Sequence, residues 1–454
     1  MLLLITFLFI FGWKVNSWFD ISAMIGLALV IFQLIQKDLR KQIKLTIPAI
    51  SLISLVIYST AVVLLTGTTD LQPILRAGRA LVVLLAGFSL FSIYEKKYEK
   101  PSEKIIEHIF ISLVFHSLIM IAMYCSDVFL NIVYSFTDVF AIVNESGQIR
   151  EGFRVCGLTY SLSQTSVLQL FGILLLPFVY SIKDNSKAKF FTAFSFIPLL
   201  ISILISGRSG LFIGFIYFIF IIIYFLYKNT ISLDLLTNNK SNIFKWLSIT
   251  ILSIIIITNL LPQKFINYSL FYAKEIFQVF TNNSVTIDNL KGMIIIPDKI
   301  STTIFGCGNY GRTEYFYLPS DIGYIKSIFA IGIIGTIIML IPFFWGINSA
   351  SKLKNKLSTI IILIILASLI LFITYSVSSF IPEVLSLITQ PIVNIPKSFA
   401  NFATGTVTND VVETIAYIFS CNAVCFNADI VIDDGGDFAM LLHSTHKDLV
   451  PKII

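Results

Sequence analysis

The residues of this chain that are best suited to chemistry are arginines set in an oily sequence. Of its 454 residues, 56% are hydrophobic and only 13% are charged. An arginine keeps its charge and offers a planar fork of N–H donors that matches the oxygens of a phosphate. Arg76 and Arg79 are three residues apart, so they would share one helix face. Further arginines follow at wider spacing, namely Arg150, Arg154, Arg208 and Arg312. Together they predict a shared site for an anion with several phosphates.

The elements that position these arginines are apolar helices. Uncharged apolar runs of about 20 residues recur along the chain, and this length crosses a bilayer as a helix. The alternation of a membrane β-barrel is absent, so we predict an all-α, polytopic transmembrane bundle of about 11 or 12 spans. The spans that can be bounded are 1–13, which is short, 19–36, 45–66, 74–94, 105–124, 160–181, 190–206, 209–227, 244–262, 323–346 and 358–378.

Lysine-rich loops predict how the bundle is oriented. Basic residues gather in short cytoplasmic loops, and the predicted spans place the lysine-rich loops on one side. These loops are 37–44, 95–104, 183–189, 228–245 and 349–356. The N-terminus is then cytoplasmic, and the net charge of +6 reflects this bias rather than a nucleic-acid partner. Two longer loops, about 125–159 and 263–322, fall on the outer side with the arginines.

Three motifs follow one another in the sequence. The first, around Arg154, reads FRVCGLTYSLSQTSVLQLFGILLL. The second, around Arg208, reads LLISILISGRSGLF, and the third reads IFGCGNYGRTEYFYLPSDIGYIKSIFAIGIIG. In these motifs and in its topology, the chain from residue 1 to about 385 resembles the O-antigen polymerases (Wzy), which are relatives of the O-antigen ligases.

The resemblance implies a membrane glycosyltransferase of the GT-C type that works without a metal or another cofactor. That family joins oligosaccharide repeat units carried on undecaprenyl diphosphate, at the periplasmic face of the bacterial inner membrane. The growing glycan leaves its lipid carrier and passes to the far-end sugar of the next unit. The partners implied are therefore the undecaprenyl-diphosphate-linked oligosaccharide, membrane lipid and a regulator of polysaccharide chain length.

Such a transfer requires positive charge beside the leaving diphosphate and a base for the acceptor hydroxyl. The expected diphosphate-binding residues are Arg154, Arg208 and Arg312, with Arg76 and Arg79 as secondary candidates. The base is Asp321 or Glu314, and Asp321 fits the family's Ser-Asp-x-Gly pattern better. Tyr310 and Tyr315 are candidates for stacking on sugar rings. The absence of histidine from residues 263–322 favours a polymerase over a ligase.

Structural roles are the alternatives for several of these residues. Arg208 can cap a helical hairpin, and Asp321 can cap the helix that follows it. The tyrosines can be anchors at the membrane interface. The stretch GCGNYG matches a dinucleotide motif without its βαβ unit, so its glycines serve a turn or let backbone amides approach a phosphate. His116, near the middle of a span, is expected to be neutral and hydrogen-bonded within the bundle.

The chain changes character after about residue 390. Residues 1–390 form the predicted polymerase domain, and residues 391–454 form an atypical polar C-terminal tail. A flippase or transporter for the same lipid-linked oligosaccharide is one functional alternative. An O-antigen ligase or an exopolysaccharide polymerase is another. Flippases have short loops and paired repeats, whereas this chain has a long second outer loop and no detectable repeat.

Overall fold

The computed structural model describes the chain in separate ranges. They are residues 1–13, 21–36, 47–137, 154–159, 162–207, 210–211, 214, 295–310, 312–313, 316–318, 320 and 323–351. The helices there are α1 (Leu2–Phe11), α2 (Ile21–Ile35), α4 (Ile47–Thr66), α5 (Gln72–Lys97), α6 (Pro101–Cys125), α7 (Asp127–Phe136), α9 (Leu162–Ser181), α10 (Ser186–Phe194), α11 (Phe196–Ser206), α16 (Ile300–Phe305) and α17 (Gly323–Ser351). The short strands β1 (Arg312–Thr313) and β2 (Phe316–Tyr317) pair antiparallel.

Five of the described helical segments are long and apolar enough to cross a membrane. They are Ile47–Thr66, Gln72–Lys97, Glu103–Cys125, Ser186–Ser206 and Gly323–Asn348, and each coincides with a predicted span. The described part of the chain is therefore predominantly helical and has the segments of a multi-pass membrane protein, as predicted. The predicted spans 1–13, 19–36 and 160–181 correspond to the shorter apolar helices α1, α2 and α9. The predicted spans 244–262 and 358–378 and the tail 391–454 lie outside the described residues, and only residues 210, 211 and 214 of the predicted span 209–227 are described.

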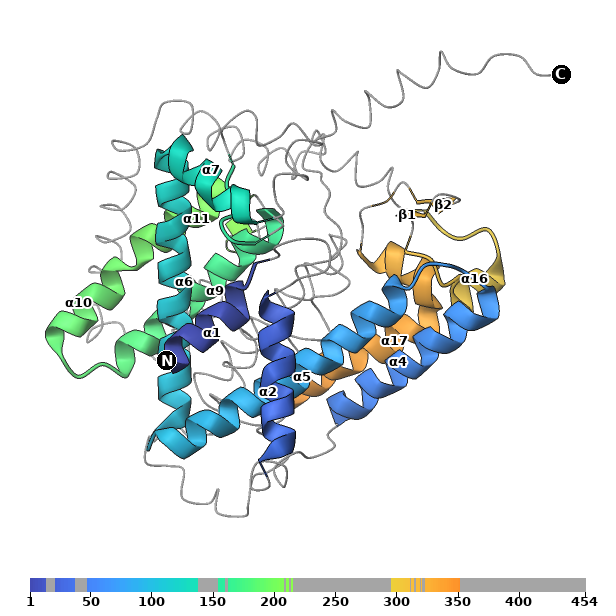
Figure 1. Ribbon diagram of the computed structural model, residues 1–454, viewed down its shortest axis with the longest axis horizontal. Coiled ribbons are helices and arrows are strands. Elements are labelled where there is room, and N and C mark those ends of the chain that lie inside the picture. The colour runs from blue at the N-terminus through green and yellow to red at the C-terminus, as the bar shows by residue number, and fades with distance from the viewer. Residues whose placement is uncertain are drawn as a thin grey trace, which may run out of the picture.

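The helices form two groups that are joined by α5 (Figure 1). In one group α17 packs along α4, with α16 against α17. In the other group α6, α9 and α11 pack on one another, and α7 follows α6 directly. Helix α5 contacts α4 at one side and α2 and α6 at the other, and α1 packs on α2 and α6. The main hydrophobic core runs through both groups.

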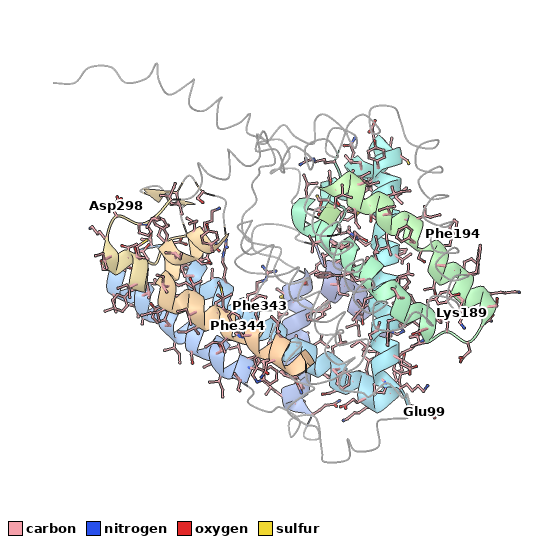
Figure 2. All side chains as sticks on the ribbon, turned by 180° about the vertical axis from the view of Figure 1, so that it is seen from behind. Glu99, Lys189, Phe194, Asp298, Phe343 and Phe344 are labelled. Carbon is pink, nitrogen blue, oxygen red and sulfur yellow. The ribbon has the colours of Figure 1, made fainter. Side chains whose placement is uncertain are left out.

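Apolar side chains on the surface and polar side chains in the interior suit a lipid environment. Neighbouring residues of α17 show the pattern, since Phe343 is fully buried whereas Phe344 is 60% exposed (Figure 2). Exposed apolar side chains such as Leu65 of α4 are frequent on the outside, and polar side chains lie inside. One polar chain links Thr6 to the hydroxyl of Tyr94 at 2.9 Å, and that hydroxyl lies 2.5 Å from a ring nitrogen of His108. Apolar surface outside and bonded polar groups inside are what a bilayer favours.

Helix α17 is broken at Gly332, where the backbone has φ of 65° and ψ of −178°. The break frees the carbonyls of Phe329 and Ala330 from the helical ladder. The amide of Cys307 donates to the first at 2.7 Å, and the amide of Gly308 donates to the second at 2.9 Å. The predicted span 323–346 thus exists, but as two helical halves whose junction is filled by the loop that follows α16.

Candidate functional site at the arginine end of the bundle

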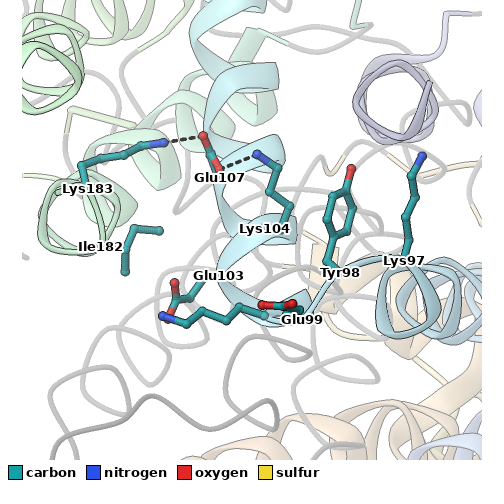
Figure 3. Close-up of a pocket in the computed structure, with 9 residues that line it drawn as sticks. Lys97, Tyr98, Glu99, Glu103, Lys104, Glu107, Ile182 and Lys183 are labelled. Atoms are coloured by element: carbon teal, nitrogen blue, oxygen red, sulfur yellow. Dashed lines mark hydrogen bonds and ion pairs between the residues drawn. The ribbon is translucent and has the colours of Figure 1, made fainter. Parts of the chain in front are cut away.

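Two lysine-rich loops meet at one end of the bundle. The ammonium of Lys183 donates to one oxygen of Glu107, and the ammonium of Lys104 donates to the other at 2.9 Å (Figure 3). Residues of both loops line a cavity of about 440 Å³ at this end. The prediction that loops 95–104 and 183–189 lie on the same side is therefore confirmed. The other three lysine-rich loops lie largely outside the described residues.

The arginines lie at the opposite end, as the directions of the helices show. Lys97 ends α5 at the cavity, and Arg76 lies 21 residues earlier, which is about 30 Å along a helix. The helical segment that starts at Ser186, beside Lys183, likewise ends at Ser206. We call this opposite end, with Arg76, residues 154–159 and Ser206, the arginine end.

Arg154 begins a short irregular stretch, residues 154–159, that we call the Arg154 segment. All six of its residues are buried, and the side chain of Arg154 is only 5% exposed. The backbone is hydrogen-bonded to three different helices. Val155 N donates to Ile205 O of α11 at 3.0 Å, Cys156 N donates to the Tyr134 hydroxyl of α7 at 3.4 Å, and Leu158 N donates to Nε2 of His116 in α6 at 3.1 Å.

The carbonyl of Cys156 has several partners. It accepts from the hydroxyl of Thr159 at 2.7 Å and from that of Thr165 in α9 at 3.3 Å. Irregular backbone is tolerated inside a membrane protein only when its polar groups are satisfied by the protein. Burial also raises the pKa of the Cys156 thiol to about 11, so the thiol stays protonated. The Arg154 segment is thus held by four helices, whereas the sequence predicted only an outer loop.

The sequence on both sides of Arg208 is bonded to the region that follows Arg154. Ile205 O accepts from Val155 N, as described above, and Gly210 N donates to Oγ of Ser166 at 2.9 Å. A Cβ at Gly210 would lie 2.5 Å from Ser166 O, so glycine permits this close approach. Arg208 itself lies outside the described residues. The two arginine motifs, far apart in the sequence, are therefore tethered to each other at the arginine end.

His116 is fully buried and hydrogen-bonded within the bundle, which confirms the prediction. Its Nε2 accepts from Leu158 N, so the ring proton is on Nδ1 and the imidazole is neutral. Nδ1 lies 2.7 Å from the side-chain amide of Gln169. The amide nitrogen of Gln169 is the atom placed against Nδ1, and the amide oxygen has no partner among the described residues. Because a ring proton on Nδ1 requires an acceptor, the opposite amide orientation, with the oxygen toward the ring, satisfies both groups.

A second group at the arginine end joins Arg76 to Tyr310. The guanidinium carbon of Arg76 lies 4.1 Å from the centre of the Tyr310 ring. Tyr310 N donates to Oδ2 of Asp70 at 2.7 Å, and Oδ1 of Asp70 accepts from Gln72 N at 2.9 Å. All three side chains are buried. The Tyr310 ring therefore packs against an arginine, and Tyr310 is only 6% exposed.

Asp70 is the residue of this group that the sequence prediction missed. A signal was present, because an aspartate two residues before a helix that starts with Gln72-Pro73 is typical of an N-terminal cap. Its second bond, to Tyr310 N, joins segments that are remote in the sequence and has no local signature.

The glycine-rich loop 306–310 uses its amides within the protein. Gly306 N donates to Thr302 O at 2.8 Å, and the amides of Cys307 and Gly308 fill the break in α17. A Cβ at Gly308 would lie 2.7 Å from Oγ1 of Thr66. These contacts support the turn interpretation of GCGNYG rather than amides that approach a phosphate.

The other predicted site residues are placed only in part. Arg79 lies on α5, one turn beyond Arg76, and is half-buried. The backbone of Arg312 pairs with Tyr317 in the β1–β2 hairpin. Glu314, Tyr315 and Asp321 lie outside the described residues, so their roles stay predictions.

Comparison of the chain with models of protein families, with curated proteins and with solved structures gives no match. In the described ranges no group of three or more histidine, cysteine, aspartate or glutamate side chains is placed to hold a metal ion. The arrangement places a buried arginine at one end of a helical bundle, in a segment whose backbone amides bond to three helices.

Proposed function

We propose that this chain is a membrane glycosyltransferase that joins undecaprenyl-diphosphate-linked oligosaccharide units into a polysaccharide, in the manner of an O-antigen polymerase. In this proposal it lies in the bacterial inner membrane, with the arginine end at the periplasmic face. The observation that carries the proposal is the burial of Arg154, which is only 5% exposed. Its segment is bonded to Ile205, and Ile205 lies three residues before Arg208.

A buried arginine in such a chain calls for a function. Arg154 lies in an irregular segment between helices and is only 5% exposed, and an arginine keeps its charge when it is buried. An anionic group that reaches this guanidinium would be held more strongly than in water, because electrostatic attraction is stronger in a site from which water is excluded.

The chemistry follows from the positions of the groups. Transfer of the glycan breaks the bond between its first sugar and the diphosphate, and negative charge builds up on the diphosphate as it leaves. Arg154, with Arg208 as its expected neighbour, would stabilise that charge without a metal. Asp321 or Glu314 would take the proton from the acceptor hydroxyl. Arg76, packed on Tyr310, would serve as structural support for the second outer loop.

The test is polymerisation by the purified chain in lipid vesicles. The vesicles receive a panel of undecaprenyl-diphosphate-linked oligosaccharides, and the products are separated on a ladder gel. We expect a ladder from the wild type, none from Arg154→Ala and a much weaker one from Arg154→Lys, because lysine keeps the charge but lacks the fork. The exposed Lys187 at the other end gives a control, and Lys187→Ala should match the wild type. A wild type without a ladder, or an Arg154→Ala variant with a normal one, would overturn the proposal.

A transporter of the same lipid-linked oligosaccharide is the second candidate, and the break in α17 favours it. Broken helices form the central sites of many transporters, where freed carbonyls bind ions or substrate. Here the carbonyls of Phe329 and Ala330 already accept from the loop amides, which weakens that interpretation. Movement of a fluorescent lipid-linked oligosaccharide across vesicles, without a ladder, would favour the transporter.

A further inference from the structure

We infer that His116 is a positioning residue for Arg154, because its ring anchors the Arg154 segment in the orientation that presents the guanidinium to a lipid diphosphate. The inference rests on the proposed function and extends it to a residue that does not touch the substrate. His116 lies in the middle of α6 and is remote in the sequence from the motifs that carry the resemblance.

The first observation is the bond from Leu158 N to Nε2 of His116 at 3.1 Å. Leu158 lies four residues after Arg154, in the same buried stretch. A neutral imidazole has one nitrogen free to accept, and here that nitrogen receives a backbone amide that has no helical or sheet partner. The histidine thereby fixes the segment at Leu158, while the bond from Val155 N to Ile205 O fixes it next to Arg154.

The second observation is that the ring is itself held in place on its other sides. Phe11 of α1 stacks on it with the ring centres 4.0 Å apart and the planes 8° from parallel. The amide of Gln169 in α9 lies 2.7 Å from Nδ1. A ring fixed by α1 and α9 transmits a defined position to the segment, which a flexible acceptor would not.

The third observation is the fit between the ring and Gly157. This glycine has φ of +66°, and a Cβ at this position would collide with the His116 ring. The same Cβ would lie 2.8 Å from Cγ of Met120. The segment therefore approaches α6 as closely as a backbone can, and only glycine suits both the conformation and the contact. Histidine and glycine form one matched contact.

Because the segment is anchored at two points, a change of His116 should weaken diphosphate binding without unfolding the protein. Loss of the acceptor would release Leu158, while Val155 would stay bonded to α11. Arg154 would then remain in the bundle but with a less defined direction. Affinity for a diphosphate should fall without loss of the fold, because a bidentate guanidinium contact depends on orientation.

The experiment compares two variants of similar size. His116→Gln keeps an acceptor oxygen near the place of Nε2, whereas His116→Phe keeps an aromatic ring and removes the acceptor. The purified full chain in detergent is titrated with undecaprenyl diphosphate, and with undecaprenol as the control that lacks phosphate. We expect wild type and His116→Gln to bind the diphosphate with similar affinity, and His116→Phe to bind about tenfold more weakly. Exchange of the Leu158 amide should be faster in His116→Phe alone.

A double-mutant comparison separates positioning from general stability. In an Arg154→Ala background, His116→Phe should cause no further loss of diphosphate affinity, since its effect passes through the arginine. Gly157→Ala disturbs the same contact from the side of the segment and should lower diphosphate affinity as much as His116→Phe does. It provides the test if the His116→Phe variant does not fold.

The outcomes distinguish this inference from the proposed function. A wild type that binds undecaprenyl diphosphate no better than undecaprenol would overturn the proposed function, and the inference with it. A wild type that binds, with His116→Phe of equal affinity, would overturn the inference alone. Equal losses in the presence and absence of Arg154 would also overturn it, because the histidine would then act on stability and not through the arginine.

Discussion

The guanidinium of Arg76 packs on the ring of Tyr310, with 4.1 Å between the guanidinium carbon and the ring centre. This contact ties the loop after α16 to the first turn of α5. It also joins one residue predicted to bind diphosphate to one predicted to bind sugar. Since both side chains are buried, the pair stabilises the arginine end.

The first prediction concerns this pair. Tyr310→Leu removes the ring and should lower stability by about 1–2 kcal/mol, which is the scale of a desolvated cation–π contact. Tyr310→Phe keeps the ring and should lose clearly less. Thermal unfolding in detergent, followed by tryptophan fluorescence, measures both. Equal loss in the two variants would show that the hydroxyl, and not the ring, carries the contact.

The second prediction concerns Asp70, whose two oxygens accept from Gln72 N and Tyr310 N. Asp70→Asn leaves one acceptor and places an N–H donor against a second donor. The expected destabilisation is about 1–3 kcal/mol, the cost of a buried unsatisfied donor. The exposed Asp127 at the start of α7 offers a control, and Asp127→Asn should change the unfolding temperature far less.

The third prediction uses two glycines of membrane helices. Gly332 has φ of +65°, and a Cβ there would collide with the carbonyl of Ile304. Gly332→Ala should therefore destabilise the protein by about 1–3 kcal/mol or prevent its folding. Gly78 in α5 has no atom within 4 Å of its Cβ position, so Gly78→Ala should be neutral or slightly stabilising. The yield of monodisperse protein and its unfolding temperature, measured for both variants and the wild type, test this difference.

Hydrophobic runs were enough to predict the spanning helices, because a bilayer imposes both length and composition on them. The lysine-rich loops were enough to predict that 95–104 and 183–189 share one side, since that bias depends on composition alone. Helix α7 was missed inside a predicted loop. Its pattern was readable, because the exposed polar residues Asp127, Asn131 and Ser135 recur every four positions along one helix face.

The Arg154 segment was beyond prediction because its order depends on partners that are remote in the sequence. Leu158 N donates to His116 and Val155 N donates to Ile205, and nothing in the local sequence indicates either partner. The break at Gly332 was hidden for a related reason. Glycine is common in membrane helices, and only the amides of the loop after α16 make this one a break.

The fourth prediction concerns two cysteines at the arginine end. Burial raises the pKa of Cys156 to about 11, so about one thousandth of it is thiolate at pH 8. Cys125 is exposed. N-ethylmaleimide should therefore modify Cys125 and spare Cys156 in the folded protein, as peptide mass spectrometry would show. Rapid labelling of Cys156 would contradict the burial of the segment.

The same pKa gives a sign for the pH dependence of stability. An ordinary thiol has a pKa of 9.0, so folding stabilises the protonated form of Cys156. This contribution is complete below pH 9 and is lost as the pH rises toward 11. The unfolding temperature of the wild type should accordingly fall more steeply over that interval than that of Cys156→Ala.

The fifth prediction is the orientation of the bundle. Glu99 and Asp298 are both exposed and lie at opposite ends of the molecule (Figure 2). Glu99 belongs to a lysine-rich loop, so the charge bias of short loops places it in the cytoplasm and Asp298 outside. The native cysteines are first replaced by alanine, because Cys125 is itself exposed at the arginine end. In intact cells, a maleimide that cannot cross membranes should then label Asp298→Cys and leave Glu99→Cys unlabelled until the membrane is permeabilised. The reverse pattern would put Arg154 on the cytoplasmic side, where the proposed polymerisation cannot take place. Labelling of both in intact cells would show that the label crosses the membrane, which a cytoplasmic control protein with one exposed cysteine detects in the same sample.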